Sequence, residues 1–171
     1  MRQGEILGLR WKDIDLENNL IYIRQTASET KELKYGAKNK SSMRTIHIPN
    51  ILVEELQSHR QLIDYGKSKA GDKYIDLDLV LPSKYGNPLD QRSIRRSFYH
   101  VTEKLGLPRI RFHDLRHTHA TLFVQQNVNV KLISERLGHS DIGTTLNTYS
   151  HVLHDMQRTI SEKLNNIFKE M

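Results

Sequence analysis

Three short stretches in the last third of the sequence decide how it is interpreted. They read His-Asp-Leu-Arg at 113–116, Leu-Gly-His at 137–139, and Thr-Thr-Leu-Asn-Thr-Tyr-Ser-His at 144–151. His113 and Arg116 are three residues apart, so on a helix they project from one face. An imidazole beside a guanidinium suits a substrate with anionic oxygens, above all a phosphate.

The second and third stretches add the other groups that such a reaction needs. His139 follows a Leu-Gly helix stop, and Tyr149 comes ten residues later. Together with His113 and Arg116 they form a set of two histidines, an arginine and a tyrosine. That set indicates phosphoryl transfer without a metal, with the tyrosine as nucleophile.

Length, charge and composition narrow the class of protein. The chain has 171 residues, a net charge of +6 and a sequence pI of about 9.5. This length favours one domain with a real core, and the basic balance favours a nucleic-acid partner. The chain has no cysteine, which excludes disulfides and thiolate sites. It has no long apolar run and no signal peptide, so a cytoplasmic protein with no membrane partner is expected.

The pattern along the chain predicts an α+β fold that is mainly α. Two strands are expected at 20–23 and 45–48, separated by a polar, lysine-rich loop over 26–43, and they suggest a small antiparallel sheet. Asn50 and Asp90 are predicted to cap helices. Helices are expected near 3–10, 51–64, 91–105, 113–126, 129–137, 141–148 and 154–169.

These residues resemble the catalytic domain of the tyrosine recombinases, the phage and transposon integrases. The stretches 113–118, 137–139 and 144–151 look like the family's second signature region. Arg-Gln-Gly-Glu-Ile-Leu-Gly-Leu at 2–9 looks like the first, and Lys-Asn-Lys-Ser-Ser-Met-Arg-Thr-Ile at 38–46 looks like its lysine-bearing β-hairpin turn. The resemblance covers nearly the whole chain. It implies one helical catalytic domain with a small antiparallel β-sheet at one edge.

The resemblance implies site-specific DNA recombination without metal, ATP or another cofactor. Tyr149 would attack a DNA phosphodiester, become joined to the 3′ phosphate and free a 5′ hydroxyl. The 5′ hydroxyl of another strand would then attack the phosphotyrosyl bond and rejoin the DNA. Arg2 and Arg116 would hold the two non-bridging oxygens, where charge builds in the transition state. His139 would hydrogen-bond a non-bridging oxygen.

Two further groups would move protons. Lys38 would be the general acid for the leaving 5′ oxygen, with Lys40 as an alternative in the same pattern. His113 would act on the proton of Tyr149, because an unperturbed tyrosine has a pKa near 10 and needs a base at neutral pH.

Supporting residues are also implied. Glu5 would buttress Arg2 from one helical turn away. Three other histidines, His117, His119 and His151, are expected to be structural, with His151 a possible neighbour of the site.

Family members carry further helices before the first arginine and a separate N-terminal DNA-binding domain. The chain is therefore expected to be an N-terminally truncated fragment that is poorly active or inactive alone. In the full-length protein the resemblance implies double-stranded DNA with attachment sites as partner, and a homotetramer on that DNA. The predicted helix at 154–169 would dock on a neighbouring protomer or pack on its own domain.

Three other interpretations compete with recombination. His113 and His117 have the i,i+4 spacing of a zinc helix, but no Glu follows His113 as it does in zinc proteases. A phosphatase or nuclease would use the same arginines and hydrolyse its intermediate. A non-catalytic DNA-binding accessory protein would share the basic charge, but it would never form a phosphotyrosyl bond to DNA, so covalent trapping distinguishes it from a recombinase.

Overall fold

The computed structural model describes residues 1–36, 43–149 and 167–168. The chain divides into two compact units, Met1–Asp114 and Leu115–Met171. Each unit has its own hydrophobic core.

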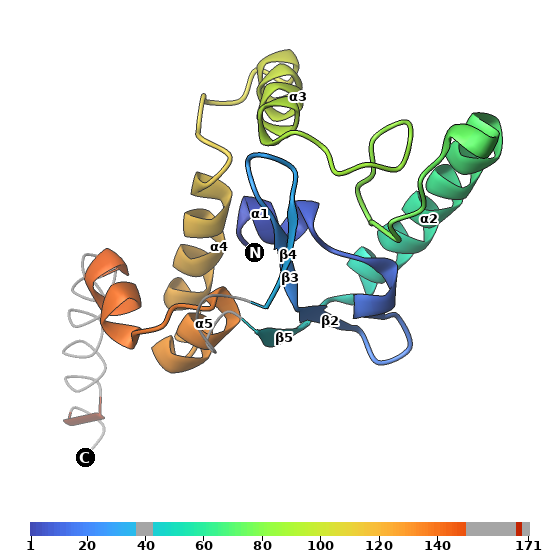
Figure 1. The fold of residues 1–171 in the computed structure, drawn as a ribbon. Helices are drawn as coiled ribbons and strands as arrows, with labels where there is room; N and C mark the ends of the chain where they lie inside the picture. Colours follow the sequence, from blue (N-terminus) through green and yellow to red (C-terminus); the bar gives the residue numbers. More distant parts are fainter. Residues whose placement is uncertain (37–42, 150–166, 169–171) are drawn as a thin grey trace. The chain divides into compact units, whose positions relative to one another are not determined.

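A three-stranded antiparallel sheet organises the first unit (Figure 1). It consists of β1 (Ile14–Asp15), β2 (Leu20–Ile23) and β5 (Arg44–His47), in the order β1-β2-β5. Ile21 lies opposite Ile46, so the alternating apolar residues of both strands face the same side. The core of this unit consists of Leu9, Trp11, Ile21, Ile23, Ile46, Ile48 and Val80. Both predicted strands and their antiparallel pairing are confirmed.

A second hairpin lies where the sequence predicts only a loop over 26–43. It pairs β3 (Gln25–Ala27) with β4 (Leu33–Tyr35). Each strand has only three residues, too few for a period-two pattern to stand out, which is why the pattern misses them. Burial at β3 comes from packing against the first helix, and the side-chain amide of Gln25 donates a 2.5 Å hydrogen bond to the Gly8 carbonyl.

The first helix, α1 (Gln3–Leu7), is shorter than the predicted 3–10. It ends at Gly8, where the chain passes so close to β3 that a Cβ would lie 2.9 Å from the backbone nitrogen of Ala27. A short 3-10 helix, η1 (Trp11–Asp13), follows. Gly8 therefore ends the helix and permits its close approach to the hairpin.

The long helix α2 (Asn50–Ala70) extends beyond the predicted 51–64. Its cap is Pro49, and Asn50 is instead the first helical residue. The Asn50 side-chain oxygen accepts a hydrogen bond from Asn19 at 2.6 Å, so the expected cap ties the helix to the turn before β2.

A 3-10 turn, η3 (Gly71–Lys73), follows α2, and a later helix, α3 (Gln91–Lys104), completes the first unit. Asp90 caps α3 as predicted, because its carboxylate accepts the backbone N–H of Arg92 at 3.0 Å.

The described part of the second unit consists of helices and the short loops that join them. It contains α4 (Asp114–Gln125), α5 (Val130–Leu137) and a helix over residues 142–149. All three confirm the predicted elements. Their shared core consists of Ala120, Val124, Ile133, Leu137 and Tyr149.

The fold class is confirmed as mainly α with small antiparallel sheets. The predicted helix at 154–169 lies outside the described residues, except for 167–168, which are helical. Within the described part of the chain, no helix has the length and apolar character needed to cross a membrane.

Candidate active site

Arg116 is the buried arginine of the second unit. It lies on α4, is 7% exposed, and its Nη2 donates a 2.6 Å hydrogen bond to the carbonyl of Leu137. That carbonyl belongs to the last turn of α5, where helix carbonyls have no partner within the helix. The arginine therefore ties α4 to the end of α5.

His139 is positioned by the end of the same helix. Gly138 adopts the left-handed conformation, with φ 70° and ψ 45°, and the backbone N–H of His139 returns to the carbonyl of Ser134 at 3.1 Å. The His139 ring then meets the Thr145 hydroxyl, with 2.7 Å between Nδ1 and Oγ1. Because Thr145 is fully buried, its hydroxyl fixes the orientation of the imidazole.

Tyr149 lies inside the core of the second unit and is 3% exposed. Its hydroxyl lies 3.2 Å from Nδ1 of His117, and the two rings are tilted by 55°. Burial raises the pKa of the Tyr149 hydroxyl above its ordinary value of about 10, and the positive charge of Arg116 opposes that shift. The phenol is therefore protonated at neutral pH and needs a proton acceptor before it can act as a nucleophile.

His117, expected from the sequence to be structural, lies against the hydroxyl of the candidate nucleophile. It is 32 positions from Tyr149, so no local spacing connects them. Consecutive residues of a helix point about 100° apart, so the place of His117 directly after Arg116 does not by itself predict this contact.

The first unit contains Arg2, at the N-terminal cap of α1. Its guanidinium forms a 3.0 Å ion pair with Glu5, and its backbone N–H donates to the other carboxylate oxygen at 2.7 Å. The expected contact between these two residues is present.

Glu5 is also bound by an arginine that sequence reasoning did not assign. Arg44, on β5, donates to both carboxylate oxygens, at 3.0 and 2.8 Å. Burial alone would raise the pKa of Glu5, but the hydrogen bonds and charges of Arg44 and Arg2 outweigh it and lower the pKa to about 2. The signal was the strand alternation, which places Arg44 on the same inward face as Ile46, where a charge needs a partner.

The remaining predicted residues lie elsewhere. His113 is exposed, in the turn before α4, so it is not on a shared helix face with Arg116 as the spacing suggested. Lys38 and Lys40 lie outside the described residues. Arg2 and His113 belong to the first unit, and Arg116, His139 and Tyr149 belong to the second.

Two histidines of α4, His117 from the zinc-helix alternative and His119, contact protein side chains. His117 contacts Tyr149, and Nε2 of His119 accepts a hydrogen bond from Nε of Arg136 at 3.2 Å. Among the described residues, no group of three or more His, Cys, Asp or Glu side chains is placed to hold a metal.

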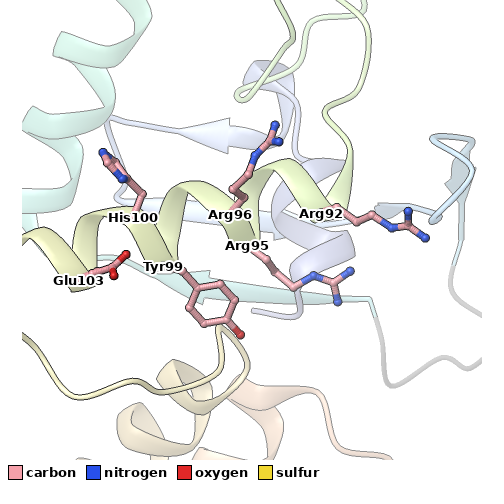
Figure 2. Close-up of a pocket in the computed structure, with 6 residues that line it drawn as sticks. All are labelled: Arg92, Arg95, Arg96, Tyr99, His100 and Glu103. Carbon is pink, nitrogen blue, oxygen red and sulfur yellow. The ribbon is translucent and has the colours of Figure 1, made fainter.

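A basic face on α3 is a second feature of the first unit. Figure 2 shows six side chains of this one helix around a hollow of about 640 Å³. The lining residues are Arg92, Arg95, Arg96, Tyr99, His100 and Glu103. Within the described part of the chain, none of the three arginines forms an ion pair with a carboxylate, so their charge is available to an anionic partner.

Known proteins similar to this chain carry related names. A tyrosine recombinase XerC-like protein of Caldanaerobacter subterraneus subsp. tengcongensis is 33% identical, over 98% of this chain and 46% of that protein. The integrase of Staphylococcus phage L54a is 30% identical, over 96% of this chain and 48% of its own length. The chain thus spans about half the length of the curated relatives it matches.

Solved structures share the fold. The Tn1549 transposon integrase, in a complex with circular intermediate DNA, superposes with a TM-score of 0.75 at 23% identity, over 96% of this chain and 56% of that one. The XerA recombinase gives a TM-score of 0.69 at 23% identity, over 92% of this chain and 52% of that one. A family model described as "Phage integrase family" matches residues 1–156. The chain therefore belongs to the phage integrase family.

Proposed function

We propose that this chain is the catalytic part of a site-specific DNA recombinase that cleaves and rejoins strands through a 3′-phosphotyrosyl intermediate. The observation that supports it most is the packing of Tyr149 against the helix that carries Arg116, close enough for the arginine's charge to act on the phenol. A tyrosine beside a buried arginine suits attack on a phosphate, because the guanidinium stabilises the charge that develops on its oxygens.

In this proposal six residues act in one reaction. Tyr149 is the nucleophile, and Arg2 and Arg116 bind the non-bridging oxygens. The other three are His139 at a non-bridging oxygen, His113 as the sequence-based candidate for acting on the proton of Tyr149, and Lys38 as general acid, with Lys40 as the alternative. That residues 1–171 form a single catalytic domain stays a prediction, as do the homotetramer on DNA and a cytoplasmic location.

Double-stranded DNA is the proposed partner. The Tn1549 neighbour is itself described in complex with DNA, and the basic face of α3 offers three arginines that no described carboxylate neutralises. Cationic side chains of this kind bind the phosphate backbone and position a protein on the duplex.

The test is covalent trapping of the protein on DNA, using the longest natural form because the relatives are about twice as long as this chain. The substrate is a nicked duplex that carries the attachment site of the element encoding the protein. The nick lets the freed fragment diffuse away, so an SDS-stable adduct accumulates. We expect an adduct with the wild type and none with Tyr149→Phe, which should still bind the duplex.

Two further results complete this test. Arg116→Ala should remove cleavage while the protein stays folded, and EDTA should not inhibit the wild type. If the wild type binds the site without forming an adduct, the protein is a DNA-binding accessory factor and the proposal fails.

A further inference from the structure

The hydroxyl of Tyr149 has a specific neighbour in the second unit, and that neighbour is a histidine. His117 lies on α4, one residue after Arg116, and its Nδ1 lies 3.2 Å from the Tyr149 oxygen. Among the described residues, no other side chain hydrogen-bonds this hydroxyl. Since Tyr149 is 3% exposed, bulk water has little access to the phenol in this conformation, which favours a protein group as the acceptor of its proton.

We propose that His117, rather than His113, accepts the proton of Tyr149 during strand cleavage. This inference rests on the proposed recombinase function and assigns one step within it. The distance of 3.2 Å is at the upper end of hydrogen-bond reach, the range in which a general base is found before substrate tightens the site. The expected base from sequence, His113, is instead exposed in the turn before α4.

The step balances without any added reactant. With its own proton on Nε2, the neutral ring of His117 accepts the phenol hydrogen at Nδ1. As the bond from the tyrosine oxygen to phosphorus forms, the phenol proton passes to Nδ1. The bond from phosphorus to the 5′ oxygen breaks, and the general acid protonates that oxygen. On rejoining, a 5′ hydroxyl attacks phosphorus and gives its proton to the deprotonated general acid, the phosphotyrosyl bond breaks, and His117 returns its proton to the phenol.

In this proposal the two neighbouring residues of α4 have different roles. Arg116 donates to the Leu137 carbonyl and places its charge near the phenol, which favours the phenolate as it forms. His117 supplies the acceptor. Without that acceptor the proton would have to leave a buried phenol whose pKa burial raises, which opposes ionisation at neutral pH.

The same contact has a purely structural alternative, in which His117 only holds the hydroxyl in place. Two substitutions separate these roles. In His117→Asn the side-chain oxygen lies near the position of Nδ1 and still accepts a hydrogen bond, but an amide does not take up a proton. In His117→Ala both the hydrogen bond and the proton acceptor are lost.

The experiment measures the rate of covalent adduct formation on the nicked attachment-site duplex, with the longest natural form of the protein. If His117 is the base, His117→Asn and His117→Ala should both slow the reaction by about 10²–10⁴-fold while binding the duplex normally. If His117 only holds the hydroxyl, His117→Asn should react at close to the wild-type rate, and the proposal is overturned.

A second measurement distinguishes the loss of a base from a folding defect, which would also slow adduct formation. Replacing Tyr149 by 3,5-difluorotyrosine lowers the intrinsic pKa of the phenol, so the reaction depends less on a base. The deficit caused by His117→Asn should then shrink by about tenfold or more. A deficit that stays the same in the fluorinated protein contradicts proton transfer to His117.

Two matched histidines serve as controls. His119, two residues further on α4, accepts a hydrogen bond from Arg136 and packs edge-on against Phe123, so His119→Gln should leave the rate unchanged. If His113→Asn, and not His117→Asn, gives the deficit that fluorination relieves, His113 is the base and the inference is wrong. If the wild type forms no adduct at all, the recombinase proposal fails and this inference fails with it.

Discussion

Arg44 donates to both carboxylate oxygens of Glu5, at 3.0 and 2.8 Å, and both side chains are more than nine-tenths buried. The same carboxylate holds Arg2 through its side chain and its backbone N–H. Glu5 therefore joins the strand β5 to the N-terminus of α1, and Arg44 fixes the carboxylate that orients Arg2. The proposed phosphate-binding arginine depends on a second arginine that does not contact substrate.

Removing Arg44 should destabilise the first unit strongly. Arg44→Met leaves the Glu5 charge buried with only the partly exposed Arg2 as cationic partner, and breaking a buried pair in this way costs about 3–5 kcal/mol. Urea unfolding of the 171-residue chain measures the loss. The matched control is Arg24→Met, because Arg24 is 42% exposed and its partner Asp13 keeps a second arginine, so the cost there should stay below about 1 kcal/mol. Equal losses in the two variants would contradict the importance of burial.

Stability should also depend on pH through Glu5. Its pKa falls from 4.5 to about 2 on folding, so the folded state binds its proton less readily than the unfolded chain does. The resulting stabilisation is fully present above pH 4.5 and is lost as the pH falls from 4.5 towards 2, with a total of about 3 kcal/mol. Urea unfolding at a series of pH values should show this decline in the wild type. Glu5→Gln, which cannot ionise, should be less stable at pH 7 and should have a flatter profile between pH 4.5 and 2.

The sequence predicts those helices and strands whose boundaries are set by residues close together in the chain. The helices from residue 91 onward follow from cap and stop residues within a few positions of each other, as with Asp90 before α3 and Gly138 after α5. The hairpin of β3 and β4 was missed because its strands are only three residues long, and the burial of β3 comes from packing against α1.

The residues of the candidate site also fall into those that local sequence motifs identify and those that depend on distant partners. Arg116, His139 and Tyr149 stand in recognisable stretches, so the sequence suffices to name them. The roles of Arg44 and His117 depend on partners 39 and 32 positions away, and pairs at such distances are set by tertiary packing. A charged residue at an inward strand position, two residues before Ile46, was the sequence signal for Arg44.

The left-handed turn at Gly138 should be sensitive to any side chain with a Cβ. Its φ of 70° costs an L-residue about 1–2 kcal/mol, and Asn bears this conformation better than Ala does. We therefore expect Gly138→Ala to lower the free energy of unfolding by about that amount and Gly138→Asn to lower it less. Thermal unfolding of the three proteins checks the order. If Ala and Asn are equally tolerated, the turn does not require its left-handed conformation.

Thr145 should matter more for catalysis than for folding. Thr145→Val keeps the buried volume but removes the hydroxyl that meets Nδ1 of His139 at 2.7 Å, at a cost of about 0.5–1.5 kcal/mol in stability. If His139 binds a phosphate oxygen, the freed ring should also lower the rate of adduct formation on the nicked duplex. Thr145→Ser restores the hydroxyl and should recover the rate. A Val variant that reacts as fast as the wild type would show that this hydrogen bond does not orient the catalytic imidazole.

The arginines of α3 should set the salt dependence of DNA binding. Arg92, Arg95 and Arg96 have no carboxylate partner among the described residues, so each one that contacts a phosphate contributes about −0.9 to the slope of log affinity against log salt concentration. Replacing Arg92 or Arg96 by Ala should flatten the slope by about that amount and weaken binding to all duplexes alike, because phosphate contacts carry no base sequence. Fluorescence anisotropy over a range of salt concentrations measures both effects.

The matched control is Arg111→Ala, because Arg111 is exposed but already pairs with Asp114 at 2.9 Å, and its loss should leave the slope nearly unchanged. If Arg111→Ala flattens the slope as much as the α3 variants do, the DNA response comes from total charge and not from this face of the helix.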